Sequence, residues 1–162
     1  MSVQHPRELF VRLLSDVRRH EERVAHSLRE IGERVEDPEI RQSLTALTYL
    51  SDRTLGTLDQ CFGMIGEKPV ETDDRLQDVF IDNFRRALDE LESPVARTLY
   101  IASKANQLMY LRAGEYGALI AMSRISGNPG VALLLESCLT DKLAFVERMR
   151  YRIREIAERE YA

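Results

Sequence analysis

The chain has 162 residues, of which 44% are hydrophobic and 31% are charged, with a formal net charge of −4 at neutral pH. This length and composition fit one globular domain, residues 1–162, that can bury a sizeable core. The acidic balance disfavours binding to nucleic acid or to an anionic membrane surface, because both of these select basic patches.

The N-terminal stretch and the cysteines favour a cytoplasmic protein. Residues Met1 to Pro6 lack the apolar segment of a signal peptide. No hydrophobic run approaches the roughly 18 residues needed to cross a bilayer, so no membrane partner is expected. Cys61 and Cys138 fall on apolar faces of different predicted helices. We therefore expect buried free thiols, with a disulfide as the less favoured alternative.

Proline and glycine positions divide the chain into five predicted helices. Asp37-Pro38 is typical of an N-cap followed by proline at the first helical position, and Ser93-Pro94 and Asn128-Pro129 repeat this pattern. The predicted helices cover residues 6–35, 38–65, 73–92, 94–126 and 129–160. No stretch alternates polar and apolar residues with a period of two, so no sheet is expected.

The segment 6–35 carries a hydrophobic stripe with one exception. Its apolar residues are spaced alternately by four and three positions: Phe10, Leu14, Val17, Val24, Leu28, Ile31 and Val35. This spacing is typical of a helix that packs along its whole length against other helices. The missing step falls on Glu21. Because a buried, unpaired carboxylate is costly, we expect Glu21 to meet an opposite charge or a cation; a side chain that escapes to water is the less favoured alternative.

Four long helices with one short helix between the second and third predict an all-α four-helix bundle with a crossover. Short turns join the first two long helices and the last two, so each of these pairs is expected to form an antiparallel hairpin. The segment 67–93 is long enough to carry the chain along the bundle. This arrangement resembles the ferritin-like topology and differs from a simple up-down-up-down bundle.

The sequence resembles the YciE/YciF family of ferritin-like bacterial stress proteins over nearly its whole length. The matching opening block is Leu9-Phe10-Val11-Arg12-Leu13-Leu14-Ser15-Asp16, followed by Glu21. Tyr116-Gly117, Leu133-Leu134 and Lys142 match later positions of that family. The resemblance implies carboxylates and histidines inside the bundle that form a di-metal site, for which ferritin-like proteins use two Glu and two Glu-x-x-His pairs.

Most of the ligands implied by the resemblance are replaced in this chain. In the second helix the family's Glu-Glu-Thr-His stretch falls on Tyr49-Leu50-Ser51-Asp52, and in the third long helix its Glu-His-Tyr-Glu stretch falls on Met109-Tyr110-Leu111-Arg112. In the last helix a run of glutamates falls on Leu139-Thr140-Asp141, and a further acidic position falls on Phe145. The chain contains no Glu-x-x-His.

Glu21, Asp141 and Asp52 therefore remain as vestigial or alternative ligands. These carboxylates are too few to balance two metal ions, so neither metal nor another cofactor is expected. Arg112 brings a permanent cation with five donors into the region. We hypothesise that Glu21 forms a buried ion pair with Arg112, or with another nearby base, in place of a metal.

Two functional hypotheses follow, and enzymatic activity is favoured by neither the motifs nor their spacing. The first is a non-catalytic member of the stress family that acts as a structural or protein-binding bundle. It would form a homodimer through an exposed apolar face with the candidates Leu50, Leu55, Phe80 and Phe84. The alternative is a metalloprotein in oxidative or general stress defence. Its reduced site would bind iron or manganese through Glu21, Asp141, Asp52 and either His20 or Glu115.

Overall fold

The computed structural model describes residues 5–73 and 75–161, and this part of the chain forms five α-helices and no strand. The helices are α1 (Pro6–Glu33), α2 (Pro38–Ile65), α3 (Arg75–Asp89), α4 (Pro94–Ile125) and α5 (Pro129–Tyr161). The predicted all-α fold is confirmed, and the helix ends differ from the predicted ones by at most three residues. Residues 1–4, used in the signal-peptide expectation, and residue 74, at the predicted start of the short helix, lie outside the described residues.

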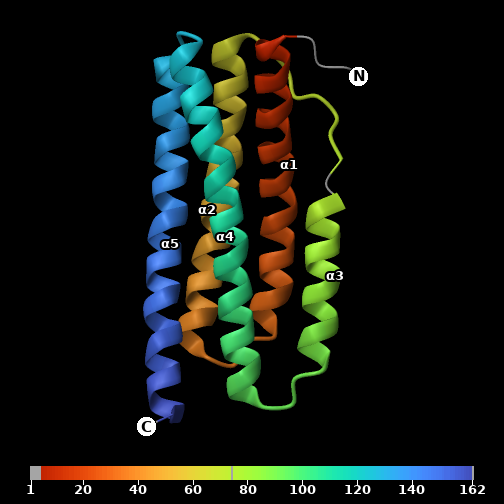
Figure 1. Cartoon of the computed structure of the whole chain (residues 1–162), viewed down its shortest axis with the longest axis vertical. Helices are drawn as coiled ribbons and strands as arrows, with labels where there is room; N and C mark the ends of the chain where they lie inside the picture. Colours follow the sequence, from red (N-terminus) through yellow and green to blue (C-terminus); the bar gives the residue numbers. More distant parts are fainter. Residues whose placement is uncertain (1–4, 74, 162) are drawn as a thin grey trace.

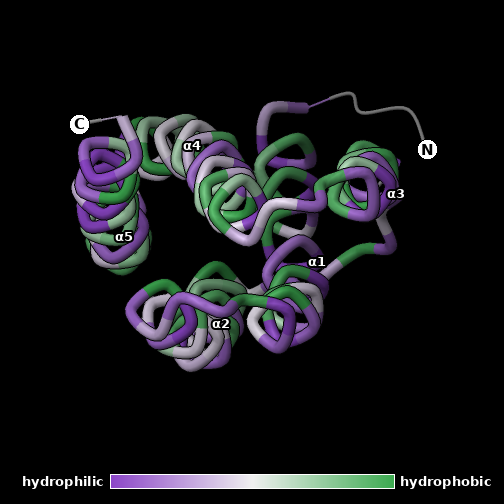
Figure 2. The backbone as a smooth tube through the Cα atoms, turned by 90° about the horizontal axis from the view of Figure 1, so that it is seen from below, coloured by the Kyte–Doolittle hydropathy of each residue, from purple (hydrophilic) through white to green (hydrophobic). Residues whose placement is uncertain are grey.

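Four long helices form a bundle, and the short helix α3 lies outside it (Figure 1). The view along the bundle places α1, α2, α5 and α4 around a common interior (Figure 2). Within this ring α1 packs on α2 and α4, and α5 packs on α2 and α4. The connection from α2 to α3 returns along the outside of the bundle, so α2 and α4 run in the same direction (Figure 1). The predicted crossover is therefore confirmed.

Local signals in the sequence set the ends of these helices. The Asp37 carboxylate caps α2 by accepting hydrogen bonds from the backbone N–H groups of Glu39 and Ile40, at 3.1 and 3.0 Å. Ser93 accepts a bond from Ala96 N–H at the start of α4. Gly66 ends α2 with a φ of 69°, in the left-handed region that favours glycine.

The core consists of two hydrophobic clusters stacked along the bundle axis. One contains Val24, Met109 and Phe145, and the other contains Val17, Tyr116 and Cys138. Each of α1, α4 and α5 therefore passes from one cluster to the other within about two turns. Between the two clusters the inward positions of α1, α4 and α5 carry charged residues: Glu21, Arg112 and Lys142.

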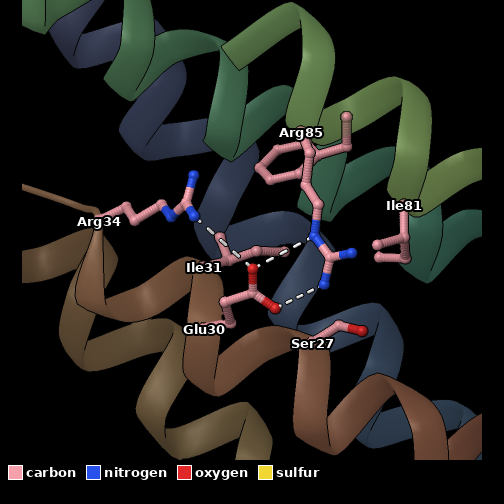
Figure 3. Close-up of a pocket in the computed structure, with 7 residues that line it drawn as sticks. Ser27, Glu30, Ile31, Arg34, Ile81 and Arg85 are labelled. Carbon is pink, nitrogen blue, oxygen red and sulfur yellow. Dashed lines mark hydrogen bonds and ion pairs between the residues drawn. The ribbon is translucent and has the colours of Figure 1, made fainter. Parts of the chain in front are cut away.

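Helix α3 is held against α1 and α4 by buried apolar residues and ion pairs. Ile81, Phe84 and Leu88 are buried, and the Phe84 ring stacks on Tyr100 with a centroid distance of 5.7 Å. Arg85 donates from Nη2 and Nε to the two carboxylate oxygens of Glu30 in α1, at 2.7 and 3.2 Å (Figure 3).

The predicted dimer surface requires a correction. Phe84 is only 4% exposed, so it belongs to the core and cannot contact another molecule. Leu50 and Phe80 are half-buried and pack against the core, and Leu55 is half-buried as well. Leu50, Phe80 and Phe84 help to attach α2 and α3 to the bundle, a use that the helical pattern alone does not distinguish from a free surface.

None of the described helices combines sufficient length with sufficient apolar character to cross a bilayer.

Candidate functional site

Each bundle helix places a buried polar side chain between the two hydrophobic clusters. These residues are Glu21 of α1, Thr54 of α2, Arg112 of α4 and Lys142 of α5, with exposed fractions of 1, 4, 1 and 3%. We call these four residues the polar layer. Charged side chains are almost never this deeply buried unless they are paired, so the layer is the candidate functional site.

Glu21 is buried, as its position in the apolar stripe of α1 predicts, and its Oε1 atom has two partners. Lys142 of α5 forms an ion pair with Oε1. The hydroxyl of Tyr116, from α4, donates a hydrogen bond to the same oxygen at 3.2 Å. The Lys142 ammonium also lies 5.2 Å from the centroid of the Tyr116 ring, within the range of a cation–π interaction. One carboxylate therefore joins three helices through charge-assisted contacts.

Tyr116 contributes to the layer as a neutral donor. Burial, followed by the nearby Glu21 carboxylate, raises the pKa of the Tyr116 hydroxyl well above its usual value. Both causes disfavour a phenolate, because that anion would lie in an apolar interior beside another negative charge. The hydroxyl proton consequently remains available to Glu21 at every ordinary pH.

Glu21 forms its ion pair with Lys142, so the expected pairing of Glu21 with Arg112 is wrong. The Arg112 Nη1 atom donates to both carboxylate oxygens of Glu115, each at 2.9 Å, one turn further along α4. The Glu115 carboxylate also lies 3.1 Å from His20 Nδ1 of α1. The hypothesis that a nearby base pairs with Glu21 therefore agrees with the structure, but this base is Lys142 and not Arg112.

A signal for Lys142 was present in the sequence. The inward positions of α5 follow the same alternation of three and four: Leu135, Cys138, Lys142, Phe145 and Met149. Lys142 interrupts this stripe in the same way that Glu21 interrupts the stripe of α1. Two interruptions of opposite charge at the same level of a bundle predict a pair, provided that the register between the helices is known.

The other two carboxylates proposed as ligands do not converge on Glu21. Asp141 has a 32% exposed side chain and forms an ion pair with Arg53 of α2. Asp52 is 56% exposed and lies 3.7 Å from Arg29 of α1. Both therefore serve as partners of arginines near the surface of the bundle.

The two cysteines are free and buried, as expected from their apolar positions. Burial, with a smaller effect of the Cys138 thiol, raises the pKa of Cys61 to about 12. Burial also raises the pKa of Cys138, against a smaller opposing effect of the Lys142 ammonium. Neither thiol is activated as a nucleophile, since the reactive form is the thiolate.

The donor set of the polar layer does not match the di-metal centre that the resemblance implies. Among residues 5–73 and 75–161, no three side chains of His, Cys, Asp or Glu are close enough together to hold a metal ion. Glu21 is instead paired with the Lys142 ammonium and the Tyr116 hydroxyl. Lys142 and Arg112 place positive charge where two metal ions would need several anionic ligands.

An all-helical bundle with a polar layer at its centre defines the class of this protein, and a scan against protein families assigns it more narrowly. Residues 5–162 match the family described as Domain of unknown function (DUF892). The chain belongs to this family, and its resemblance to YciE/YciF proteins is confirmed. A search of curated proteins found no significant match.

Three of the solved structures with a similar fold come from bacteria. The Escherichia coli stress protein YciF is 16% identical, with a TM-score of 0.92 over 96% of this chain and 99% of its own. YcfI, described as a putative structural protein from Rhodopseudomonas palustris, is 21% identical, with a TM-score of 0.88 over 92% of this chain and 95% of its own. A protein from Xanthomonas campestris is 16% identical, with a TM-score of 0.74 over 98% of this chain and 100% of its own. At these identities the likeness concerns the fold.

Proposed function

We propose that this protein is a cytoplasmic, non-catalytic member of the YciE/YciF stress family that acts as a structural or protein-binding bundle. In this proposal its ferritin-like centre is held by protein charges in place of metal ions. The observation that carries the proposal is the Glu21–Lys142 ion pair, fully buried and joined by the Tyr116 hydroxyl. A carboxylate balanced by an ammonium has no need of a metal ion.

Two further observations support this function. The thiols and the phenol of the interior have raised pKa values, so none of them is poised for nucleophilic or acid–base work. Of the similar solved structures, one is described as a stress protein and another as a putative structural protein.

Metal analysis of the purified protein tests the proposal directly. The protein is produced in medium supplemented with iron and manganese, purified without chelators, and analysed for bound transition metals. We expect far less than one metal ion per chain. A content near or above one per chain, retained after gel filtration, would overturn the proposal in favour of the metalloprotein alternative.

The metalloprotein alternative has a candidate location at the edge of the bundle, where Glu115 already accepts hydrogen bonds from Arg112. His20 Nδ1 and the Glu115 carboxylate lie 3.1 Å apart, and their side chains are 12 and 25% exposed. An imidazole and a carboxylate at the edge of the bundle could share one iron or manganese ion. If metal is found, Glu115→Gln should release it when this edge is the site, whereas Asp52→Asn serves as the matched control on α2.

We also propose a homodimer, now through the outer face of α3. Leu76 and Val79 are 62 and 57% exposed on this helix, which lies outside the four-helix ring (Figure 2). Burial of two such side chains against a second copy would remove apolar surface from water on both molecules.

A further inference from the structure

Three buried polar atoms of the polar layer have no hydrogen-bond partner among the described residues. They are Oε2 of Glu21 and Nε and Nη2 of Arg112. Both side chains are 1% exposed, so bulk solvent does not reach these atoms. The Nε and Nη2 atoms form one edge of the guanidinium, which is the edge that usually grips an oxygen acceptor with two parallel bonds.

Contacts of neighbouring residues connect Glu21 of α1 with the segment of α4 that contains Arg112. Tyr116, which donates to the other oxygen of Glu21, follows Arg112 by one turn on the inward face of α4. Glu115, which holds Nη1 of Arg112, also contacts His20, the neighbour of Glu21 in α1. These contacts connect α1 and α4 beside Glu21 and Arg112, although the two residues form no ion pair with each other.

Leaving these atoms without partners would be costly. An unsatisfied buried donor or acceptor destabilises a protein by about 1–3 kcal/mol, and more when the group is charged. Native proteins satisfy such groups with buried water, which typically makes about three hydrogen bonds to otherwise unpaired atoms. The unpartnered atoms are two donors, Nε and Nη2 of Arg112, and one acceptor, Oε2 of Glu21, so together they match the three hydrogen bonds of a buried water.

The charges of the layer identify the chemical class of the guest. Arg112 and Lys142 are balanced by Glu115 and Glu21, so the polar layer together with Glu115 is electrically neutral. An added anion would leave a net negative charge beside Glu21, and an added cation would face the Arg112 guanidinium. A neutral molecule that both accepts and donates satisfies both sides. We propose that one ordered water molecule bridges the Nε–Nη2 edge of Arg112 to Oε2 of Glu21.

This water site goes beyond the proposed function, because it concerns the second oxygen of Glu21, and the ion pair to Lys142 does not depend on it. A high-resolution crystal structure of the full chain tests it, together with water-to-protein cross-relaxation measured by NMR in solution. The expected result is one water within hydrogen-bond distance of Oε2 of Glu21 and of the Arg112 edge. The NMR measurement should also show a long-lived water signal at nearby backbone amides.

Two variants complete the test. Arg112→Met removes the donors and should abolish both the electron density and the NMR signal of this water. Glu115→Gln is the matched control, because it changes only the group that holds Nη1 and should retain the water. A direct Arg112–Glu21 contact, an anion at the site, or no atom in reach of both groups in the wild-type protein would each overturn the inference, whether or not the variants fold.

Discussion

Lys142 and Glu21 show how the energetic value of one buried charge depends on the other. Removing a carboxylate and an ammonium from water costs several kcal/mol per ion, and their attraction repays this cost only with good geometry and further hydrogen bonds. Tyr116 supplies one such bond, at 3.2 Å, and its ring faces the ammonium. The pair is therefore weak evidence for high stability but strong evidence that neither partner can be removed alone.

Lys142→Met should destabilise the protein by about 3–5 kcal/mol, because it leaves the Glu21 carboxylate buried without its counter-charge. The double variant Glu21→Leu/Lys142→Met should recover most of this loss, since an apolar pair of similar volume replaces the ions. Urea unfolding of the single and double variants measures both effects. Arg112→Met is a useful comparison: it should cost less, because its partner Glu115 is 25% exposed and can turn to water. Equal losses in the Lys142 single and double variants would contradict the ion-pair interpretation.

The raised pKa of Tyr116 predicts that the folded protein loses stability at alkaline pH. Its pKa in the folded state is raised above the ordinary value of 10.0, which applies in the unfolded chain. The contribution of this group is therefore fully present below pH 10.0 and is lost as the pH rises toward the folded-state pKa. Phenolate absorbance during a pH titration should show one tyrosine of the six that ionises only as the helices unfold. The same late component should be missing in Tyr116→Phe, and its persistence there would disprove the assignment.

At the scale of elements, Asp37 connects the beginning of α2 to the end of α5. Its carboxylate caps α2 and accepts a hydrogen bond from Nη2 of Arg152 at 2.7 Å. Burial alone would raise the pKa of Asp37. The Arg152 guanidinium and the backbone N–H groups of Ile40 and Glu39 outweigh burial, so the pKa is lower than usual. A single side chain thus defines a helix start and ties two helices together.

Asp37 should make stability depend on pH in the acid range. Because its folded-state pKa lies below the usual 3.8, its contribution is present above that value and is lost as the pH falls through the folded-state pKa. Asp37→Asn keeps a capping oxygen but removes the charge, so it should flatten this part of the stability–pH curve. Asp37→Ala also removes the cap and should cost about 1 kcal/mol more at neutral pH. Chemical denaturation at a series of pH values distinguishes these outcomes; identical curves for wild type and Asp37→Asn would contradict them.

For the whole molecule, the polar layer divides a long core into two hydrophobic clusters, and α3 covers part of one side. The layer joins α1, α4 and α5 near their midpoints through buried contacts between Glu21, Tyr116 and Lys142. The crossover helix buries one face against α1 and α4 and leaves Leu76 and Val79 exposed on the other. This face is where association with a second copy is proposed.

Val79→Glu should convert the proposed homodimer to a monomer without lowering the melting temperature, because Val79 is 57% exposed and contributes little to the core. Sedimentation velocity measures the oligomeric state, and circular dichroism the melting temperature. Ile125→Glu, at the end of the bundle where Ile125 is 89% exposed, is the matched control and should remain dimeric. A monomeric wild-type protein would disprove the homodimer, and a dimeric Val79→Glu variant would disprove this interface.

The sequence by itself determined which segments are helical and which side of each is buried. Asp37-Pro38, Ser93-Pro94 and the glycines act within a few residues, and the three-four spacing around Glu21 identifies a buried stripe without reference to any other helix. Only the tertiary structure decided what faces that stripe. Lys142 and Arg112 both interrupt inward stripes, and the rotation and register of α4 and α5 place Lys142 on Glu21 and Arg112 on Glu115. Phe84 was likewise ambiguous, because an apolar residue on a short helix looks the same whether it covers its own bundle or another molecule. Local signals depend on chemistry along the chain, whereas partners depend on how whole helices pack.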